Sequence, residues 1–160
     1  MILGLTGSFG SGKSTVAQMM SAFCDARIID ADLITRELQM PGAIGHARII
    51  KAFGPSVMTE SGELDRRKLA DMVFNDEESL ERLNSIIHPL VMDEEVRMLD
   101  MYANDPLVVL MVPLLYESGT EKLCDKIAVV TVTEEERNSR LAVRDNLTPE
   151  LIMQRLAAQM

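Results

Sequence analysis

The chain has 160 residues, of which 47% are hydrophobic and 26% are charged, a balance typical of one globular domain large enough to fold without disulfides or a structural metal. Its two cysteines, Cys24 and Cys124, lack C-x-x-C spacing and predict ordinary thiols in a reducing compartment. The net charge of −9 argues against a broad nucleic-acid surface, and the absence of a signal-peptide pattern or a bilayer-length apolar run predicts a cytoplasmic protein without a membrane partner.

Four apolar runs predict the strands of a parallel sheet. They cover residues 2–6, 26–30, 107–112 and 127–132 and do not alternate with polar residues, as is typical of strands buried on both faces. Helix-forming segments separate them, which predicts an α/β fold with a three-layer core. Residues 42–104 lack a strong strand, and we interpret them as a helical, substrate-binding insertion within a single domain of residues 1–160.

Capping residues predict the starts of several helices. Asn75 or Asp76 is suited to begin a long helix, since acidic residues follow in its first turn. Thr133, with Glu136 three residues later, has the pattern of a capping box for a helix that continues through Arg144. Thr148 precedes a proline in the first helical position. Residues 134–147 are predicted to form a lid.

Residues 7–14 read Gly-Ser-Phe-Gly-Ser-Gly-Lys-Ser and match G-x-x-x-x-G-K-[ST] at every fixed position. An apolar strand leads in and a helix leads out, so a chance glycine-rich turn is the weaker interpretation. The glycines let backbone N–H groups converge on phosphates, and the helix N-terminus adds its dipole. Lys13 is expected to reach the β- and γ-phosphates of ATP, and the Ser14 hydroxyl to ligate Mg²⁺. The predicted ATP-binding residues of this loop are Gly10, Ser11, Gly12, Lys13, Ser14 and Thr15.

Two aspartates follow the second predicted strand. Asp30 and Asp32 would lie beyond the carboxyl end of that strand, where open α/β sheets bind ligands. A carboxylate in this place can ligate Mg²⁺ or accept the proton of an acceptor hydroxyl. The alternative is that one aspartate caps the next helix while the other is solvated. Arg36 lies one helical turn beyond Asp32 and is predicted to face the same region.

The remaining basic candidates have two interpretations each. Arg137, Arg140 and Arg144 share one helix face and are suited either to bind ATP phosphates or to pair with the neighbouring residues 134–136, all glutamates. Arg66 and Arg67 are either an anionic-substrate site or a surface pair. His88 stands alone before a proline and is predicted to be structural or to contact substrate.

Together these motifs make the chain resemble the dephospho-coenzyme A kinase family. The resemblance extends from residue 2 to residue 160 and rests on an ordered set of matches. They are residues 4–7 with the phosphate loop through Thr15, residues 29–32 with Arg36, Arg66, Arg67, Phe74, residues 88–90, residues 112–117, Arg137, Arg140, Leu141, Arg144, Asp145, Arg155, Ala158 and Gln159.

The resemblance implies transfer of the ATP γ-phosphoryl group to the ribose 3′-hydroxyl of dephospho-coenzyme A, with ATP and Mg²⁺ as cofactors. It implies a five-stranded parallel core, with Asp32 as the base and a metal ligand. Lys13 and Arg140 would complete the catalytic set, and Arg144 would help to bind ATP. Asp32, Arg36, Arg66 and His88 would bind the substrate, and the protein would be a monomer or small homo-oligomer.

The chain departs from the family pattern at two places. Ser8 and Phe9 stand where the family usually has Gly-Ile. This replacement is tolerated only if the backbone at Ser8 does not adopt a positive φ. The chain also stops at Met160, whereas the family continues for about forty residues to a further strand, and this predicts a four-stranded sheet with an exposed edge.

Other nucleotide-binding classes remain as alternatives. Another small-molecule P-loop kinase, such as a nucleoside monophosphate kinase, shares the loop, and an inactive ATP-binding fragment would bind without turnover. A GTP-binding switch is disfavoured because no N-K-x-D occurs and no aspartate has glycine three residues later. A transport or motor ATPase would need an acidic residue at the end of the third strand, where Pro113 follows instead.

Overall fold

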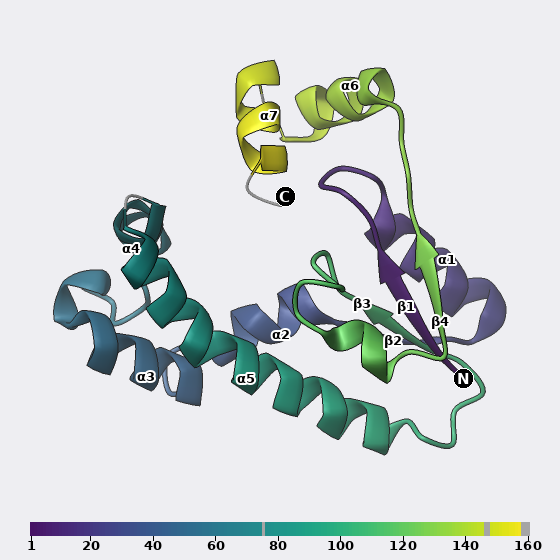
Figure 1. Cartoon of the computed structure of the whole chain (residues 1–160), viewed down its shortest axis with the longest axis horizontal. Helices are drawn as coiled ribbons and strands as arrows, with labels where there is room; N and C mark the ends of the chain where they lie inside the picture. Colours follow the sequence, from purple (N-terminus) through teal and green to yellow (C-terminus); the bar gives the residue numbers. More distant parts are fainter. Residues whose placement is uncertain (75, 146–147, 158–160) are drawn as a thin grey trace. The chain divides into compact units, whose positions relative to one another are not determined.

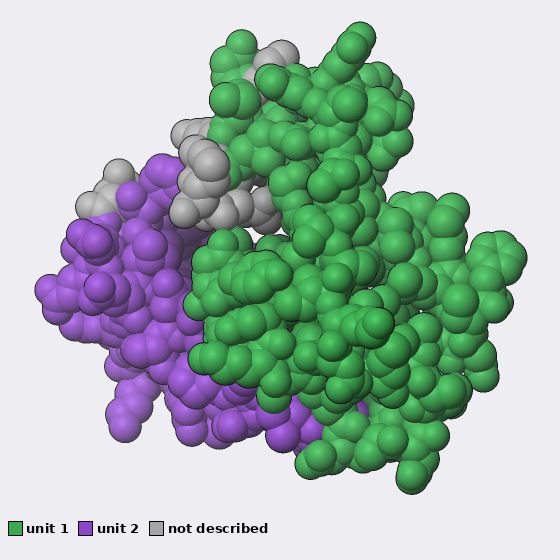
Figure 2. Space-filling view, turned by 45° about the vertical axis from the view of Figure 1, so that its right-hand side comes forward, with its two compact units in different colours: residues 1–30, 99–160 green, residues 31–98 purple. Residues whose placement is uncertain are grey.

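The computed structural model describes residues 1–74, 76–145 and 148–157. The chain forms two compact units, which Figure 2 shows in different colours. Unit 1 comprises Met1–Asp30 and Leu99–Met160, and unit 2 comprises Ala31–Met98. Asn75, Ala158 and Gln159, on which parts of the sequence analysis rest, lie outside the described residues. Among the described residues, no helix combines the length and apolar character that crossing a membrane requires.

Unit 1 contains a parallel sheet of four strands, drawn in Figure 1. The strands are β1 (Ile2–Thr6), β2 (Arg27–Asp30), β3 (Val108–Met111) and β4 (Lys126–Val129), in the spatial order β2-β3-β1-β4. β3 is buried along its whole length, as expected for an interior strand of a parallel sheet. The α/β fold predicted from the apolar runs is therefore confirmed.

Alternate residues of β1 point to different layers of unit 1. Helix α1 (Lys13–Cys24) covers one face, where Leu5, Ala17 and Val109 share a buried cluster. Gly4 points to the other face, where an added Cβ would lie 2.8 Å from the Sγ of Cys124. Cys124 directly follows the short helix η2 (Thr120–Leu123), so the segment after β3 covers this second face. These layers pack on both faces of β1 and so fix its carboxyl end, which continues directly into the phosphate loop.

The predicted burial of β4 on both faces is wrong. Its first and last residues, Lys126 and Val129, are exposed, because β4 forms an edge of the described sheet. The strand was also expected to reach residue 132 but ends at Val129. The N–H of Val130 donates to the carbonyl of Thr6 at 2.8 Å, and β1 turns into the phosphate loop directly after Thr6. Later residues of the segment therefore have no strand left to pair with.

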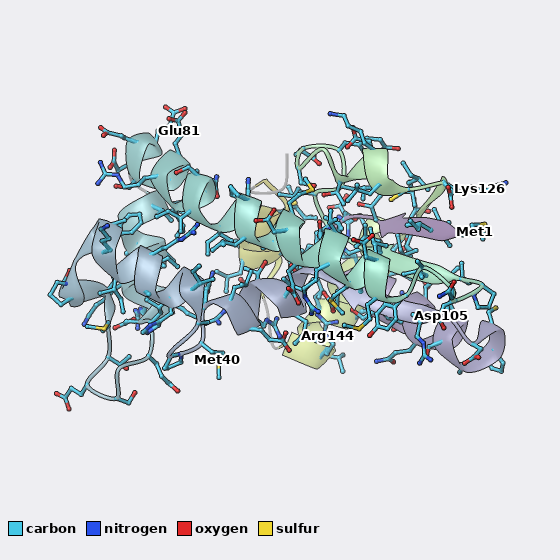
Figure 3. All side chains as sticks on the ribbon, turned by 90° about the horizontal axis from the view of Figure 1, so that it is seen from below. Met1, Met40, Glu81, Asp105, Lys126 and Arg144 are labelled. Carbon is cyan, nitrogen blue, oxygen red and sulfur yellow. The ribbon has the colours of Figure 1, made fainter. Side chains whose placement is uncertain are left out.

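The amino-terminal edge of the sheet is closed by polar contacts. The N–H of Ile2 donates to Oδ2 of Asp125 at 2.7 Å, and the terminal ammonium of Met1 donates to the carbonyl of Pro106 at 3.2 Å. Figure 3 labels Met1, Asp105 and Lys126 at this edge. Because all four strands are parallel, their carboxyl ends meet at the opposite edge, where the phosphate loop lies.

Two helices end the described part of unit 1. Helix α6 (Glu134–Asp145) begins after Thr133, whose Oγ1 accepts a hydrogen bond from the N–H of Glu136 at 3.3 Å, so the predicted cap is confirmed. Helix α7 (Pro149–Ala157) begins after Thr148, as expected from the proline in its first position. Residues 146 and 147 of the predicted lid lie outside the described residues.

Unit 2 is helical. It contains α2 (Ala31–Leu38), α3 (Ile44–Phe53), η1 (Pro55–Val57), α4 (Arg66–Phe74) and most of α5 (Glu77–Met101). Its core includes Ile49, Val57, Leu69 and Ile87, which are all buried. These apolar residues come from four different helices, so unit 2 has a core of its own.

Aspartates cap two helices of unit 2. The carboxylate of Asp76 accepts hydrogen bonds from the hydroxyl and the N–H of Ser79, and these bonds, led by the hydroxyl, lower the pKa of Asp76. Asp65 accepts a hydrogen bond from the N–H of Lys68, the leading cause of its own lowered pKa. Asp76 is thus one of the two caps that the sequence suggested for the long helix.

Candidate active site

The loop between β1 and α1 has the backbone of a phosphate cradle. Gly7, Gly10 and Gly12 have φ values of 148°, 75° and 97°, a region that residues with a Cβ seldom adopt. Among the described non-glycine residues only Asp25 has a positive φ. Ser8 therefore needs no positive φ to occupy the place where the family usually has a glycine. The three glycines therefore carry the turns, and the serine and phenylalanine between them are accommodated without strain.

Lys13 lies over the mouth of this loop. Its Nζ donates to the carbonyl of Gly7 at 2.6 Å and to that of Ser8 at 3.1 Å. The ammonium is therefore held at the loop that would cradle the phosphates, although Lys13 is the first residue of α1. This position suits a point charge that reaches bound phosphate oxygens.

The loop also contains a polar atom without a protein partner. Ser11 is 3% exposed, and its Oγ has no hydrogen-bond partner in the described part of the chain. A buried hydroxyl without a partner costs about 1–3 kcal/mol. A phosphate oxygen in the cradle would accept its hydrogen bond, so the loop is suited to a bound polyphosphate.

Gly7→Ala is expected to lower the free energy of unfolding by about 2–5 kcal/mol. About 1–2 kcal/mol comes from the positive φ and about 1–3 kcal/mol from overpacking, because a Cβ on Gly7 would lie 2.3 Å from the carbonyl oxygen of Val130. The matched control is Gly42→Ala, where φ is +89° but nothing lies within 4 Å. Urea unfolding of both variants measures the difference between their free energies of unfolding. Equal losses of stability in the two variants would contradict the contribution assigned to overpacking at Gly7.

Helix α6 contacts the loop directly. A Cβ on Gly10 would lie 2.8 Å from Cδ1 of Leu141 and 3.1 Å from Cγ of Arg137. A Cβ on Gly12 would lie 3.8 Å from Nη1 of Arg140. The glycine at position 10 therefore leaves room for two side chains of α6, and one turn of the helix brings two guanidinium-bearing residues to the loop.

Arg140 and Arg144, two of the three arginines in the predicted lid, lie in different settings. Arg140 Nη2 donates to Oε1 of Glu136 at 3.2 Å, and the two side chains are 54% and 59% exposed, so this pair contributes little to stability. Arg140 is thus available to a ligand while remaining beside Gly12. Arg144 lies exposed in the last turn of α6.

Asp30 occupies the carboxyl end of β2. It is in register with Met111, which is in register with Leu5 just before the loop. Two strand spacings therefore separate Asp30 from β1, roughly 10 Å across the sheet. Asp30 therefore lies at the same edge of the sheet as the phosphate loop, with β3 between the two strands.

The other predicted substrate residues belong to unit 2. Asp32 and Arg36 are exposed and lie one turn apart on α2, Arg66 is exposed at the start of α4, and His88 is exposed in α5. Their contribution to one site with the phosphate loop stays a prediction. Sequence reasoning missed the contact of Leu141 with the loop; its place directly after Arg140 in an apolar position was the available signal.

The metal prediction named Ser14 and Asp32. Among the described residues, no group of three or more histidines, cysteines, aspartates or glutamates is arranged to hold a metal ion. Mg²⁺ beside nucleotide phosphates needs only one or two protein ligands, since phosphates and water supply the rest. The exposed Ser14 at the start of α1 offers a hydroxyl oxygen, a ligand of the hard type that this ion prefers.

A phosphate loop at the carboxyl end of a central parallel strand, followed by a helix, defines a P-loop nucleotide-binding protein of the α/β class. A family model described as "Dephospho-CoA kinase" matches residues 1–160. The chain belongs to the dephospho-CoA kinase family. It is therefore a kinase, a transferase for which ATP is the phosphoryl donor.

Individual relatives agree with this assignment. A dephospho-CoA kinase from Bacillus licheniformis is 42% identical over 99% of this chain and 80% of its own length. One from Symbiobacterium thermophilum is 45% identical over 99% of this chain and 67% of its own length. A crystal structure from Thermus thermophilus matches with a TM-score of 0.86 at 34% identity, covering 100% of this chain and 80% of that one. The dephospho-CoA kinase of Campylobacter jejuni matches with a TM-score of 0.67 at 25% identity, covering 99% and 79%.

Proposed function

We propose that this chain transfers the γ-phosphoryl group of ATP to the ribose 3′-hydroxyl of dephospho-coenzyme A, which forms coenzyme A and ADP. The observation that carries the proposal is the complete phosphate cradle in a chain whose whole length matches the family. Phosphoryl transfer needs little covalent chemistry from the protein, and its rate depends on positioning and charge stabilisation. The loop amides, Lys13 and Arg140 would supply both.

Asp32 is proposed as the base that accepts the proton of the acceptor hydroxyl. It follows Asp30 by two residues, so covalent geometry keeps their Cα atoms within about 7 Å of each other. Asp30 ends β2 at the edge of the sheet where the loop lies. A carboxylate on the exposed face of the first turn of α2 therefore suits an acceptor brought to that edge.

Mg²⁺ is proposed as the accompanying ion, with Ser14 and Asp32 as its protein ligands. When bound, the ion would neutralise charge on the β- and γ-phosphates during transfer. The chain's own part is to hold the nucleotide: the loop N–H groups orient the phosphates, and Lys13 and Arg140 balance their charge. Arg144 would assist Arg140 from the same face of α6.

Acceptor binding is proposed for the helical region of residues 42–104, with Arg66 and His88 as contacts, and for Arg36 of the preceding helix α2. Basic side chains there suit the phosphates of dephospho-coenzyme A. Residues 134–147 are proposed as the lid, which the contacts of Leu141 and Arg140 with the loop support. Cys24 and Cys124 are not joined in a disulfide, and this together with the use of ATP supports a cytoplasmic location. We propose a monomer or small homo-oligomer without a nucleic-acid partner.

The test is mass-spectrometric detection of coenzyme A after incubation with ATP, Mg²⁺ and dephospho-coenzyme A, in parallel with a set of nucleoside monophosphates. Product from dephospho-coenzyme A alone is expected. A nucleoside diphosphate product would overturn the acceptor assignment. ATP binding without any product would instead favour the alternative of an inactive ATP-binding fragment.

A further inference from the structure

Arg137 has a setting that its neighbours on α6 lack. Its Cγ lies 3.1 Å from the Cβ position of Gly10, so the aliphatic part of the side chain packs on the phosphate loop. Its Nε is buried and has no hydrogen-bond partner among the described residues. Burying a charged donor without an acceptor is costly, which indicates that an acceptor from outside the chain belongs at this position.

A second atom beside the same glycine is in the same condition. Ser11, the residue after Gly10, has a buried Oγ without a partner in the described part of the chain. The described residues contain three such side-chain atoms, and two of them are these donors of the loop and of α6. One anionic ligand over Gly10 would give both donors an acceptor.

The position of Arg137 in α6 is unfavourable for the helix by itself. Its N–H donates to the carbonyl of Thr133, so it directly follows the first turn of α6, in which positions 134–136 are glutamates. The positive end of the helix dipole favours those acidic residues and disfavours a cation there. A bound anion would remove this penalty, whereas simple packing over Gly10 would need only the methylene groups.

We propose that Arg137 is a further ATP-binding residue, and that its guanidinium contacts the polyphosphate of the nucleotide where the polyphosphate passes over Gly10. The proposal deepens the proposed kinase function and rests on ATP being bound by this loop. It does not depend on the acceptor. Arg140 beside Gly12 and Arg137 beside Gly10 would then hold the nucleotide from successive turns of one helix.

The test compares Arg137→Met with the wild-type chain by titration calorimetry of MgATP without acceptor, at two or more salt concentrations. Methionine keeps an unbranched stem over Gly10 and removes the charge. The dissociation constant at low salt is expected to rise about 10- to 100-fold. The ratio of the dissociation constant of the variant to that of the wild type is expected to become smaller as salt increases, because salt screens a contact between charges. Arg48→Met, at an exposed position of α3, is the control for the loss of one positive charge.

Equal affinity in Arg137→Met and wild type would overturn the proposal. A ratio that does not change with salt would also overturn it, since that result indicates only lost packing over Gly10. If Arg137→Met does not fold, as judged by thermal melting without nucleotide, Arg137→Gln replaces it in the same titration. Failure of the proposed acceptor reaction is visible separately as absent coenzyme A, because this measurement reads ATP binding alone.

Discussion

Asp32→Asn is expected to lower the turnover number about 100- to 10,000-fold while leaving ATP affinity nearly unchanged. The substitution keeps the size of the side chain and removes the group proposed to accept the hydroxyl proton. Asp32 lies exposed in the first turn of α2, outside the loop that cradles the phosphates. Steady-state assay of coenzyme A formation gives the turnover number, and calorimetry with MgATP gives the affinity.

The control for this substitution is Asp93→Asn, at an exposed position of α5 in the same unit. It removes one negative charge from a residue that is not among the proposed catalytic, metal or acceptor contacts, so its turnover number should match that of the wild type. An Asp32→Asn variant with full activity would refute the assignment of the base. Loss of ATP affinity together with turnover would indicate that Asp32 acts mainly on the bound metal–nucleotide complex.

Lys13→Met is expected to impair both binding and transfer. The ammonium is held by the carbonyls of Gly7 and Ser8 at the mouth of the loop, and methionine offers no charge there. Removing one preorganised donor from a site of developing charge typically costs about 100- to 1,000-fold in rate. We therefore expect kcat/KM for ATP to fall by about that factor and the MgATP dissociation constant to rise.

Lys126→Met serves as the matched control for Lys13→Met. Lys126 is exposed at the start of β4, at the sheet edge opposite the loop, so its loss removes the same charge far from the phosphates. Its kinetics should equal those of the wild type. Unchanged kinetics in Lys13→Met itself would refute the role of this lysine, and a lowered melting temperature without nucleotide would point to a structural contribution.

Local sequence carried enough information to predict the elements around the site. The glycines and Lys13 of the phosphate loop are identified by spacing, because only residues without a Cβ adopt the backbone angles of such a cradle at low cost. Thr133 and Thr148 marked helix starts for a similar reason, since a short polar side chain satisfies the free N–H groups of the first turn. These features depend on neighbours a few residues away.

The ends and exposure of β4 needed the tertiary structure. Apolar residues up to position 132 favoured a longer strand, but pairing stops where β1 turns at Thr6. Exposure of Val129 follows from the place of β4 at the edge of the described sheet. Strand order is a property of long-range pairing, and no local pattern encodes it.

The sequence by itself determined the α/β class, the phosphate loop and, through its ordered motifs, the kinase family that the comparisons confirm. Only the tertiary structure decided that α6 lies against the loop, with Leu141 beside Gly10 and the Nε of Arg137 buried. The reason is physical. Helical spacing shows that three arginines share one face, but which of them loses contact with water depends on packing between segments more than a hundred residues apart in the chain.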